Sequence, residues 1–468
     1  MAKLKDIPKR LGYVLGGQWT RDVLWTAFTI ILARHSPEMI GQIMLALSFG
    51  YIVRHVADVG LNYFLVSAFA KKDVRPLLLL GDITWLKFAL LLIALLITWL
   101  FTSWQNYDFE LQLTVMAIAT GLGLEAVVNS FFALCQARGR QDVEMRVRIP
   151  ASLISMGTGI TLVLFHMPVY YIALYKPIES LLLIAISLKA LGRNPIKALS
   201  IERLKSIATQ WRKGLVFTCI SICAIFYNKM NVFFLKKYGG DAAVGAYSVS
   251  WEVVDGLSIL ISSALLGKVV YPILAKLWDT DRVEFQKLAG QTTRSLWAAC
   301  MPLIYIICVE SDRILAFVYG EHYTIAVTAQ RILTPCIATA FLHNLAAYAM
   351  MSMRKTSLLM VFYSSGLVVN IILCAYLTAI MPLEGAALSI TLTKLWVAIC
   401  TVSYFQYIAK PMLNKEWLLV IFVPLLAFVL WFGLSPYTHR LVAEVIGLVP
   451  LLLLLWKWRP PAPFEQKS

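Results

Sequence analysis

Residues 86–100 read LKFALLLIALLITWL, an almost unbroken apolar run, and similar runs lie at residues 418–430 (LLVIFVPLLAFVL) and 446–456 (IGLVPLLLLLW). A helix needs roughly 20 mainly apolar residues to cross about 30 Å of hydrocarbon. The chain has 468 residues, of which 59% are hydrophobic and only 15% are charged. Because so few polar groups could not cover the surface of a soluble protein of this size, the sequence predicts an all-α polytopic membrane protein.

The apolar blocks and the polar residues between them predict about fourteen transmembrane helices. The expected spans are residues 12–33, 40–69, 77–101, 111–136, 146–166, 168–191, 213–237, 243–275, 291–311, 324–353, 357–379, 384–409, 416–433 and 439–457. Several of these segments contain Gly, Pro or charged residues, so a strict hydropathy window would count only about twelve or thirteen.

Basic residues are concentrated in every second connection between these spans. The basic connections lie at residues 1–10, 71–75, 138–148, 193–213, 276–287, 354–355, 410–415 and 457–467. Basic residues favour the cytoplasmic side of a membrane, so the alternation predicts that both termini lie in the cytoplasm. The same rule explains nearly all of the formal charge of +16 without a nucleic-acid partner.

The sequence carries no signature of catalysis or of a resident cofactor. It has no phosphate-binding loop and no HExxH motif. All eight cysteines fall inside expected spans, and no His or further Cys completes a metal set around Cys219 and Cys223. The stretch Asp279-Thr280-Asp281 resembles a metal–sugar-nucleotide element, but we interpret it as a solvated loop. We therefore expect a protein that is not an enzyme and that holds no metal.

The candidate functional residues are the polar groups well inside the spans, because an ionisable group there costs about 2.5–3.5 kcal/mol or more unless it faces protein or water. The cationic and amide members are expected to bind substrate in a hydrated cavity: Arg21, Arg54, Lys176, Lys229, Asn231 and Lys394. The acidic members are expected to bind a coupling ion or to form charge pairs: Asp22, Asp58, Glu125, Glu179, Glu252 and Asp255. The planar guanidinium group matches phosphate oxygens, which makes the two arginines candidate diphosphate ligands.

Simpler explanations compete with a functional role for several of these groups. Arg54 with Asp58, and Lys176 with Glu179, have the spacing that allows neutralisation within one helix. Lys87 and Lys268 lie nearer the expected inward side and could extend to it. By contrast, Glu252 and Asp255 repel each other and need a cation, a proton or a basic neighbour. Acids and bases nearly balance, so a cationic cavity does not follow from this set.

Two halves of the chain look related. The stretch at residues 36–42 opens the second span, and the stretch at residues 240–246 opens the eighth. A repeat with equal orientation predicts two lobes related by an axis along the membrane normal, with a cleft between them. The expected domains are a six-helix lobe at residues 1–191, a cytoplasmic linker at 192–212, a second six-helix lobe at 213–409, and two extra helices with a cytoplasmic tail at 410–468.

The second half also resembles a known family. Its segments are GAYSVSWE (245–252), VYPILA (270–275), VYGEHY (318–323), GLVVNIIL (366–373) and GAA (385–387). In this order they resemble Wzx-type polysaccharide or O-antigen flippases of the multidrug/oligosaccharidyl-lipid/polysaccharide exporter superfamily. The resemblance implies two lobes around a V-shaped cavity that opens alternately to each side. It also implies arginines in the first two helices that serve the cavity, as Arg21 and Arg54 would here.

The function implied by this resemblance is transfer of a polyprenyl-diphosphate-linked oligosaccharide from the cytoplasmic to the outer leaflet of a bacterial inner membrane. With no ATPase domain in the chain, Na⁺ or H⁺ is the expected coupling ion, and other glycan-assembly membrane proteins are possible partners. Three alternatives stay open. They are a cation-coupled drug or metabolite exporter of the same fold, a membrane glycosyltransferase or polymerase, and a scaffold of a glycan-assembly complex that transports nothing.

Overall fold

The computed structural model describes residues 7–69, 76–138, 140–191, 215–261, 266, 270–410 and 419–458. Within these ranges the regular structure is helical, and no residue is assigned to a strand. The expected all-α fold is therefore confirmed. The expected linker at residues 192–212, Lys268 and both ends of the chain lie outside the described residues.

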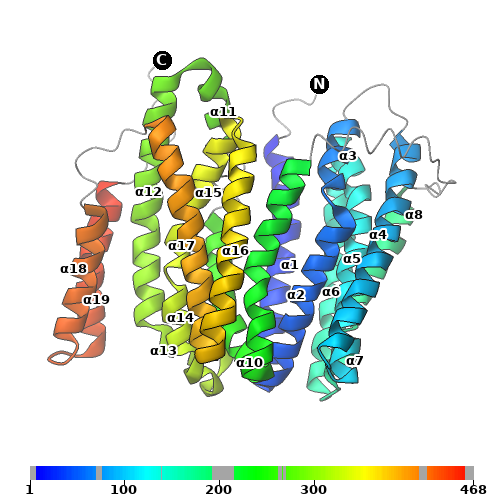
Figure 1. Ribbon diagram of the computed structural model, residues 1–468, viewed down its shortest axis with the longest axis horizontal. Helices are drawn as coiled ribbons and strands as arrows, with labels where there is room; N and C mark the ends of the chain where they lie inside the picture. The colour runs from blue at the N-terminus through cyan, green and yellow to red at the C-terminus, as the bar shows by residue number, and fades with distance from the viewer. Residues whose placement is uncertain are drawn as a thin grey trace. The chain divides into compact units, whose positions relative to one another are not determined.

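The described residues group into two compact units, Met1–Gly245 and Ala246–Ser468 (Figure 1). The helices of the first unit are α1 (Ile7–His35), α2 (Pro37–Asp58), α3 (Leu61–Phe69), α4 (Pro76–Trp104), α5 (Phe109–Ala137), α6 (Gln141–Leu164), α7 (Val169–Ile172) and α8 (Tyr175–Leu191). Helix α10 (Leu215–Ile261) begins in this unit, turns at Gly240, where φ is 75°, and continues into the second unit. The expected lobe boundaries at residues 191 and 213 stay a prediction.

The second unit contains the rest of the chain. Its helices are α11 (Tyr271–Thr280), α12 (Arg282–Val309), α13 (Ser311–Tyr319), η4 (Glu321–Ala326), α14 (Val327–Leu333), α15 (Cys336–Ser352), α16 (Thr356–Ile380), α17 (Pro382–Ala409), α18 (Leu419–Leu434) and α19 (Arg440–Lys457). Among the described residues, 10 helices are long and apolar enough to cross a membrane, so the expected count of about fourteen is approximate.

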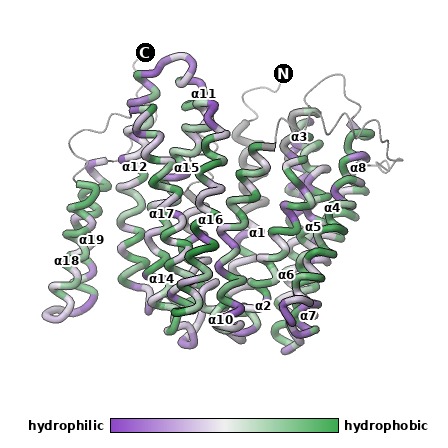
Figure 2. Tube along the Cα trace, viewed as in Figure 1, coloured by the Kyte–Doolittle hydropathy of each residue, from purple (hydrophilic) through white to green (hydrophobic). Residues whose placement is uncertain are grey.

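The exposed side chains of these helices suit a lipid environment. On α4, Leu92, Leu96 and Leu100 are 53–59% exposed. Figure 2 shows hydrophobic residues along the bodies of α4 and α16, and hydrophilic residues on α11. Since a soluble protein does not expose such long apolar faces, this pattern confirms a multi-pass membrane protein.

The expected span 40–69 is two helices, because the chain leaves the helical conformation at Val59 and Gly60. Their φ values are 40° and 73°, a region in which a β-branched residue such as valine is strained. Thr218, near the start of α10, donates a hydrogen bond of 3.2 Å to the carbonyl oxygen of Val59. A Cβ at Gly60 would overlap the hydroxyl of Thr218. Glycine therefore lets the start of α10 pack directly on the break between α2 and α3.

The start of α2 packs against α10 just beyond the turn at Gly240. A Cβ added at Gly41 would overlap the carbonyl oxygen of Asp241, and one added at Gly245 would overlap that of Pro37. The amide of Gln42 donates to Asp241 at 3.0 Å. The two stretches that suggested an internal repeat thus touch each other through glycines that permit close backbone approach.

We expect Gly41→Ala to lower the free energy of unfolding by about 1–3 kcal/mol, because the added methyl group has no space. Thermal unfolding of the purified protein in detergent measures this change. Gly157→Ala on α6 is the control, since nothing lies within 4 Å of an added Cβ there, and alanine favours a helix by up to about 1 kcal/mol over glycine. Equal melting temperatures for the two variants would contradict the close approach.

The two C-terminal helices, α18 and α19, pack on α12 through specific polar contacts. The indole of Trp297 donates to the carbonyl oxygen of Val420 at 3.2 Å, and the hydroxyl of Tyr305 donates to that of Glu444 at 3.1 Å. Ala298, Leu454 and Trp458 form an apolar cluster beside these bonds. This hairpin is thus held by both apolar packing and hydrogen bonds.

At the other end of the hairpin, Arg440 binds Asp312 with both guanidinium NH₂ groups, at 2.6 and 2.7 Å. These hydrogen bonds lower the pKa of Asp312 to about 2, from an ordinary value of 3.8, although partial burial opposes the shift. A carboxylate with a depressed pKa stabilises the fold above its unfolded-state pKa, and this contribution is lost as the pH falls through the folded-state value.

We therefore expect the wild-type melting temperature to fall between about pH 4 and pH 2 partly through loss of this pair. Asp312→Asn should lower the melting temperature at pH 7, and the gap to wild type should narrow as the pH approaches 2. Differential scanning fluorimetry across this range checks the prediction. A constant gap at all these pH values would show that the pair does not stabilise the hairpin.

Candidate functional site

Four cationic side chains of the first unit converge on the buried carboxylate of Glu125. Glu125 lies on α5 and is 0% exposed. The cations contribute nitrogens 3.2 Å (Arg21), 3.6 Å (Arg54), 3.5 Å (Arg148) and 3.0 Å (Lys176) from its oxygens. The cations come from four different helices, so this carboxylate links α1, α2, α6 and α8. We call these five residues the Glu125 cluster.

The burial of these residues divides the cluster into an inner and an outer part. Lys176 and Arg148 are 3% and 17% exposed, whereas Arg21 and Arg54 are 26% and 28% exposed. A buried carboxylate is tolerated only when it is paired and hydrogen-bonded. Arg21 donates hydrogen bonds of 3.2 and 3.5 Å to the two oxygens of Glu125, and the inner cations pair with the same carboxylate. Arg21 and Arg54 are the members of the cluster that keep the larger exposed side-chain surface.

Helix α8 is placed by a close backbone approach to α5. A Cβ at Gly121 would lie 2.6 Å from the carbonyl carbon of Lys176, and Ser180 donates to the carbonyl oxygen of Gly121 at 2.6 Å. On the same helix Lys176 also pairs with Glu179 at 2.5 Å. The expected neutralisation of Lys176 by Glu179 within one helix thus exists, but Lys176 binds Glu125 at the same time.

Arg148 is a member of the cluster that the sequence did not indicate. It lies at the start of the expected span 146–166 but was assigned to the basic connection at residues 138–148, whereas α6 begins at Gln141, five residues before that expected span. Arg148 also donates to Glu144 at 3.0 Å and to the Oδ1 of Asn129 at 2.8 Å. The spacing of Glu144 and Arg148, four residues apart, is the signal that could have indicated a helix here.

A second buried pair lies next to the cluster and corrects two expectations. Lys87 was expected to extend toward the cytoplasm, but it is 0% exposed and its Nζ lies 2.6 Å from Asp58. The same atom donates to the Oδ1 of Asn62 at 2.7 Å. Asp58 therefore pairs with Lys87 on α4, and Arg54 pairs with Glu125 on α5. Neutralisation of Asp58 by Arg54 within α2 was the wrong explanation.

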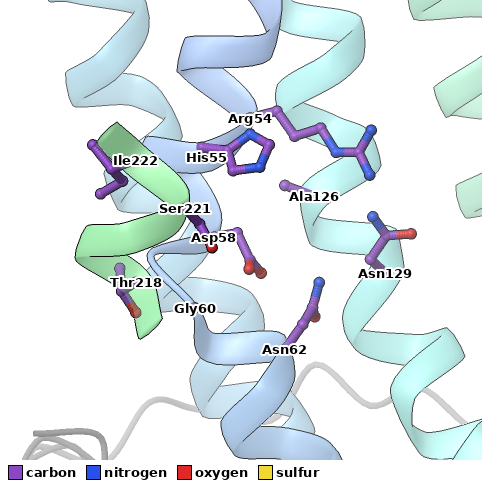
Figure 3. A pocket seen from close by; sticks show the side chains of 10 residues that line it. All are labelled: Arg54, His55, Asp58, Gly60, Asn62, Ala126, Asn129, Thr218, Ser221 and Ile222. Carbon is purple, nitrogen blue, oxygen red and sulfur yellow. The ribbon is translucent and has the colours of Figure 1, made fainter. Parts of the chain in front are cut away.

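Between these groups lies a polar cavity of about 220 Å³. Figure 3 shows side chains from α2, α3, α5 and α10 around it. The lining residues are Arg54, His55, Asp58, Gly60, Asn62, Ala126, Asn129, Thr218, Ser221 and Ile222. Because Arg54 lines the cavity and also contacts Glu125, the cavity and the cluster form one site. The sequence reasoning did not select the asparagines, the histidine or the hydroxyl groups of this lining.

The remaining expected site residues belong neither to the Glu125 cluster nor to the lining of the cavity. In the first unit Asp22 is exposed, Asn231 is buried, and the ammonium of Lys229 lies 5.0 Å from the centre of the Tyr51 ring. In the second unit, the ammonium of Lys394 lies 4.3 Å from the centre of the Trp251 ring, next to Glu252 in the sequence. Asp255 and Glu252 are both half-buried on α10. The functional roles proposed for all these residues stay predictions.

The two acidic residues of the Asp279-Thr280-Asp281 stretch have structural contacts. Asp281 caps α12 by accepting hydrogen bonds of 3.0 Å from the backbone of Val283 and Glu284. Asp279 pairs with Arg354 at 3.4 Å. Throughout the part of the chain that the structure describes, no three His, Cys, Asp or Glu side chains form a group that could hold a metal ion.

Two curated proteins are similar to part of this chain. The probable low-salt glycan biosynthesis flippase Agl15 of Haloferax volcanii is 26% identical over 193 residues, covering 41% of this chain and 39% of that protein. A putative O-antigen transporter of Shigella flexneri is 25% identical over 177 residues, covering 37% of this chain and 40% of that protein. The chain thus matches about two fifths of the length of each relative.

The solved structure of the lipid II flippase MurJ in an inward closed conformation has a similar fold. Its TM-score is 0.71, with 13% identity, over 96% of this chain and 98% of that one. At this identity the likeness concerns the fold alone, and it confirms the fold that the resemblance implied. The sequence profile described as "polysaccharide biosynthesis protein" matches residues 31–328, which is more than half of the chain. The chain therefore belongs to this family of polysaccharide biosynthesis proteins.

Proposed function

We propose that this protein is a flippase that moves a polyprenyl-diphosphate-linked oligosaccharide from the cytoplasmic to the outer leaflet of a bacterial inner membrane. The observation that carries the proposal is the Glu125 cluster, in which Arg21 and Arg54 keep about a quarter of their side-chain surface exposed. Arginine binds diphosphate oxygens through two parallel hydrogen bonds, which a membrane interior strengthens. A diphosphate group is therefore a fitting ligand for the outer edge of the cluster.

The relatives support the same cargo class. One is named a glycan biosynthesis flippase, one an O-antigen transporter, and the protein of similar fold a lipid II flippase. Their names describe transport and not catalysis. In the stretch that resembles a sugar-nucleotide element, Asp281 caps a helix and Asp279 pairs with Arg354. We therefore favour a transporter over a glycosyltransferase. Alternating access driven by Na⁺ or H⁺, with both termini in the cytoplasm, completes the proposal.

The experiment that tests the proposal is removal of the gene in its native host, with wild-type protein supplied from an inducible plasmid. Without inducer, a lipid-linked oligosaccharide should accumulate, and it should be protected from a glycan-modifying enzyme added outside spheroplasts. With inducer, it should become accessible and surface glycan should return. Normal surface glycan without inducer, together with loss of small-dye efflux, would favour the drug exporter instead. Accumulation of a shortened glycan would favour a transferase or polymerase.

A further inference from the structure

The ammonium group of Lys87 is held by three oxygens from three other helices. Its Nζ lies 2.6 Å from Oδ1 of Asp58 on α2, 2.7 Å from Oδ1 of Asn62 on α3, and 3.0 Å from the carbonyl oxygen of Ala126 on α5. The contacts with Asn62 and Ala126 are hydrogen bonds that the ammonium donates, and the contact with Asp58 is an ion pair. We call these three oxygens the oxygen cage.

The cage stands at the wall of the 220 Å³ cavity. Asp58, Asn62 and Ala126 all line that cavity, and in Figure 3 the side chains of Asp58 and Asn62 extend toward each other across it. Lys87 is fully buried and reaches the cage from α4. An ion in the cavity would therefore meet the oxygen cage directly, but for the ammonium group that fills it.

The ligands of the cage are those of a monovalent metal ion. Carboxylate, amide and backbone carbonyl oxygens are the groups that hold hard cations such as Na⁺ and K⁺. The cage supplies one of each, and its single negative charge balances a single positive one. Besides Asp58, the charged or titratable groups that line the cavity are Arg54 and His55. Arg54 pairs with Glu125, so Asp58 needs the cation that Lys87 supplies.

We propose that Lys87 is a tethered cation that permanently occupies a monovalent-cation site of the first unit. A relative with a short side chain at this position would bind Na⁺ or K⁺ in the oxygen cage, whereas this protein provides the charge covalently. Asp58 was expected to bind a coupling ion or to form a charge pair, and in this arrangement Lys87 supplies its counter-charge. The inference does not depend on which cargo the protein carries.

The test compares wild type with Lys87→Ala, both as the purified full-length protein in lipid nanodiscs. Melting temperatures are measured in choline chloride, NaCl, KCl and methylammonium chloride at equal ionic strength. The wild-type melting temperature should be the same in all four salts. Lys87→Ala should melt lower in choline and recover by about 3 °C or more, in a saturable way, with one or more of the small cations.

Two further variants separate a cation site from general salt effects. Lys87→Ala/Asp58→Asn removes the charge of the cage and should show no recovery with any cation. Lys236→Ala is the matched control, because Lys236 pairs with Asp241 at 2.6 Å outside the cage and the cavity. It should respond equally to all four salts.

Two results would overturn the proposal. One is a Lys87→Ala protein that melts at the same temperature in choline as in the small cations. The other is a wild-type protein with the same cation dependence as the variant. If Lys87→Ala does not fold in choline, the yield of folded protein on purification in each salt replaces the melting temperature, with the same expected order.

Discussion

Glu125→Gln should lower the free energy of unfolding by about 3–5 kcal/mol, the cost of removing one partner from a buried ion pair. The cost is large because four cations within 3.6 Å of this carboxylate lose their shared counter-charge. Urea or thermal unfolding of the detergent-purified protein measures it. Glutamine keeps the shape and one acceptor oxygen, so the loss reports on charge and not on a cavity.

Glu144→Gln is the matched control for this prediction. Glu144 also accepts a hydrogen bond from Arg148, at 3.0 Å, but it is partly exposed, and its other oxygen accepts from the neutral amide of Gln136. We expect a loss of no more than about 1 kcal/mol, as for an ordinary partly exposed pair. The double variant Glu125→Gln/Lys176→Gln removes one charge of each sign and should recover part of the loss. If Glu144→Gln were as damaging as Glu125→Gln, convergence on Glu125 would not be what stabilises the unit.

The same substitution should change ligand binding in the opposite direction. Arg21 and Arg54 are the outer members of the cluster, and Glu125 competes with any anionic ligand for them. We expect Glu125→Gln to bind inorganic pyrophosphate more tightly than wild type when both are compared at a temperature at which both are folded. Isothermal titration calorimetry on the purified protein measures this difference. Weaker binding would mean that Glu125 orients the arginines for the ligand and does not compete with it.

The sequence predicted the helices well because their signal is local. Apolar runs such as residues 86–100 and the polar residues between them fix where a span lies, and α4 extends only a few residues beyond the expected 77–101. The break at Val59 and Gly60 was not predicted. Its cause is contact with Thr218, which lies far away in the sequence and cannot be inferred from a hydropathy pattern.

The pairing of the buried charges could not be predicted for a similar reason. The free-energy cost of placing an ionisable side chain inside a membrane identifies Arg21, Glu125 and Lys176 as unusual. Hydropathy does not show which faces of α1, α5 and α8 meet. Lys87 illustrates the limit. Its depth suggested that it could extend to the inward side, whereas its direction, toward Asp58 and away from lipid, is set by packing of α4 against α2 and α5. Arg148 was missed because the positive-inside pattern already explained a basic residue there.

Arg54→Ala should reduce glycan export at least tenfold while the amount of protein in the membrane stays near the wild-type level. A charge-assisted hydrogen bond contributes about 1.5–3 kcal/mol, and each 1.4 kcal/mol corresponds to a factor of ten in binding. Arg54 is the residue that belongs both to the Glu125 cluster and to the lining of the cavity. Surface glycan in the complemented deletion strain, normalised to protein level by immunoblot, measures the effect.

The two companion variants decide whether the guanidinium group itself matters. Arg54→Lys keeps the positive charge near Glu125 but loses the planar fork, so it should retain the wild-type stability and only part of the export. Arg34→Ala removes an exposed arginine near the end of α1 and should export normally. If Arg54→Ala also exports normally, Arg54 does not bind the cargo. If Arg54→Lys fails as completely as Arg54→Ala while remaining stable, paired hydrogen bonds to an anion, and not positive charge alone, are what this position supplies.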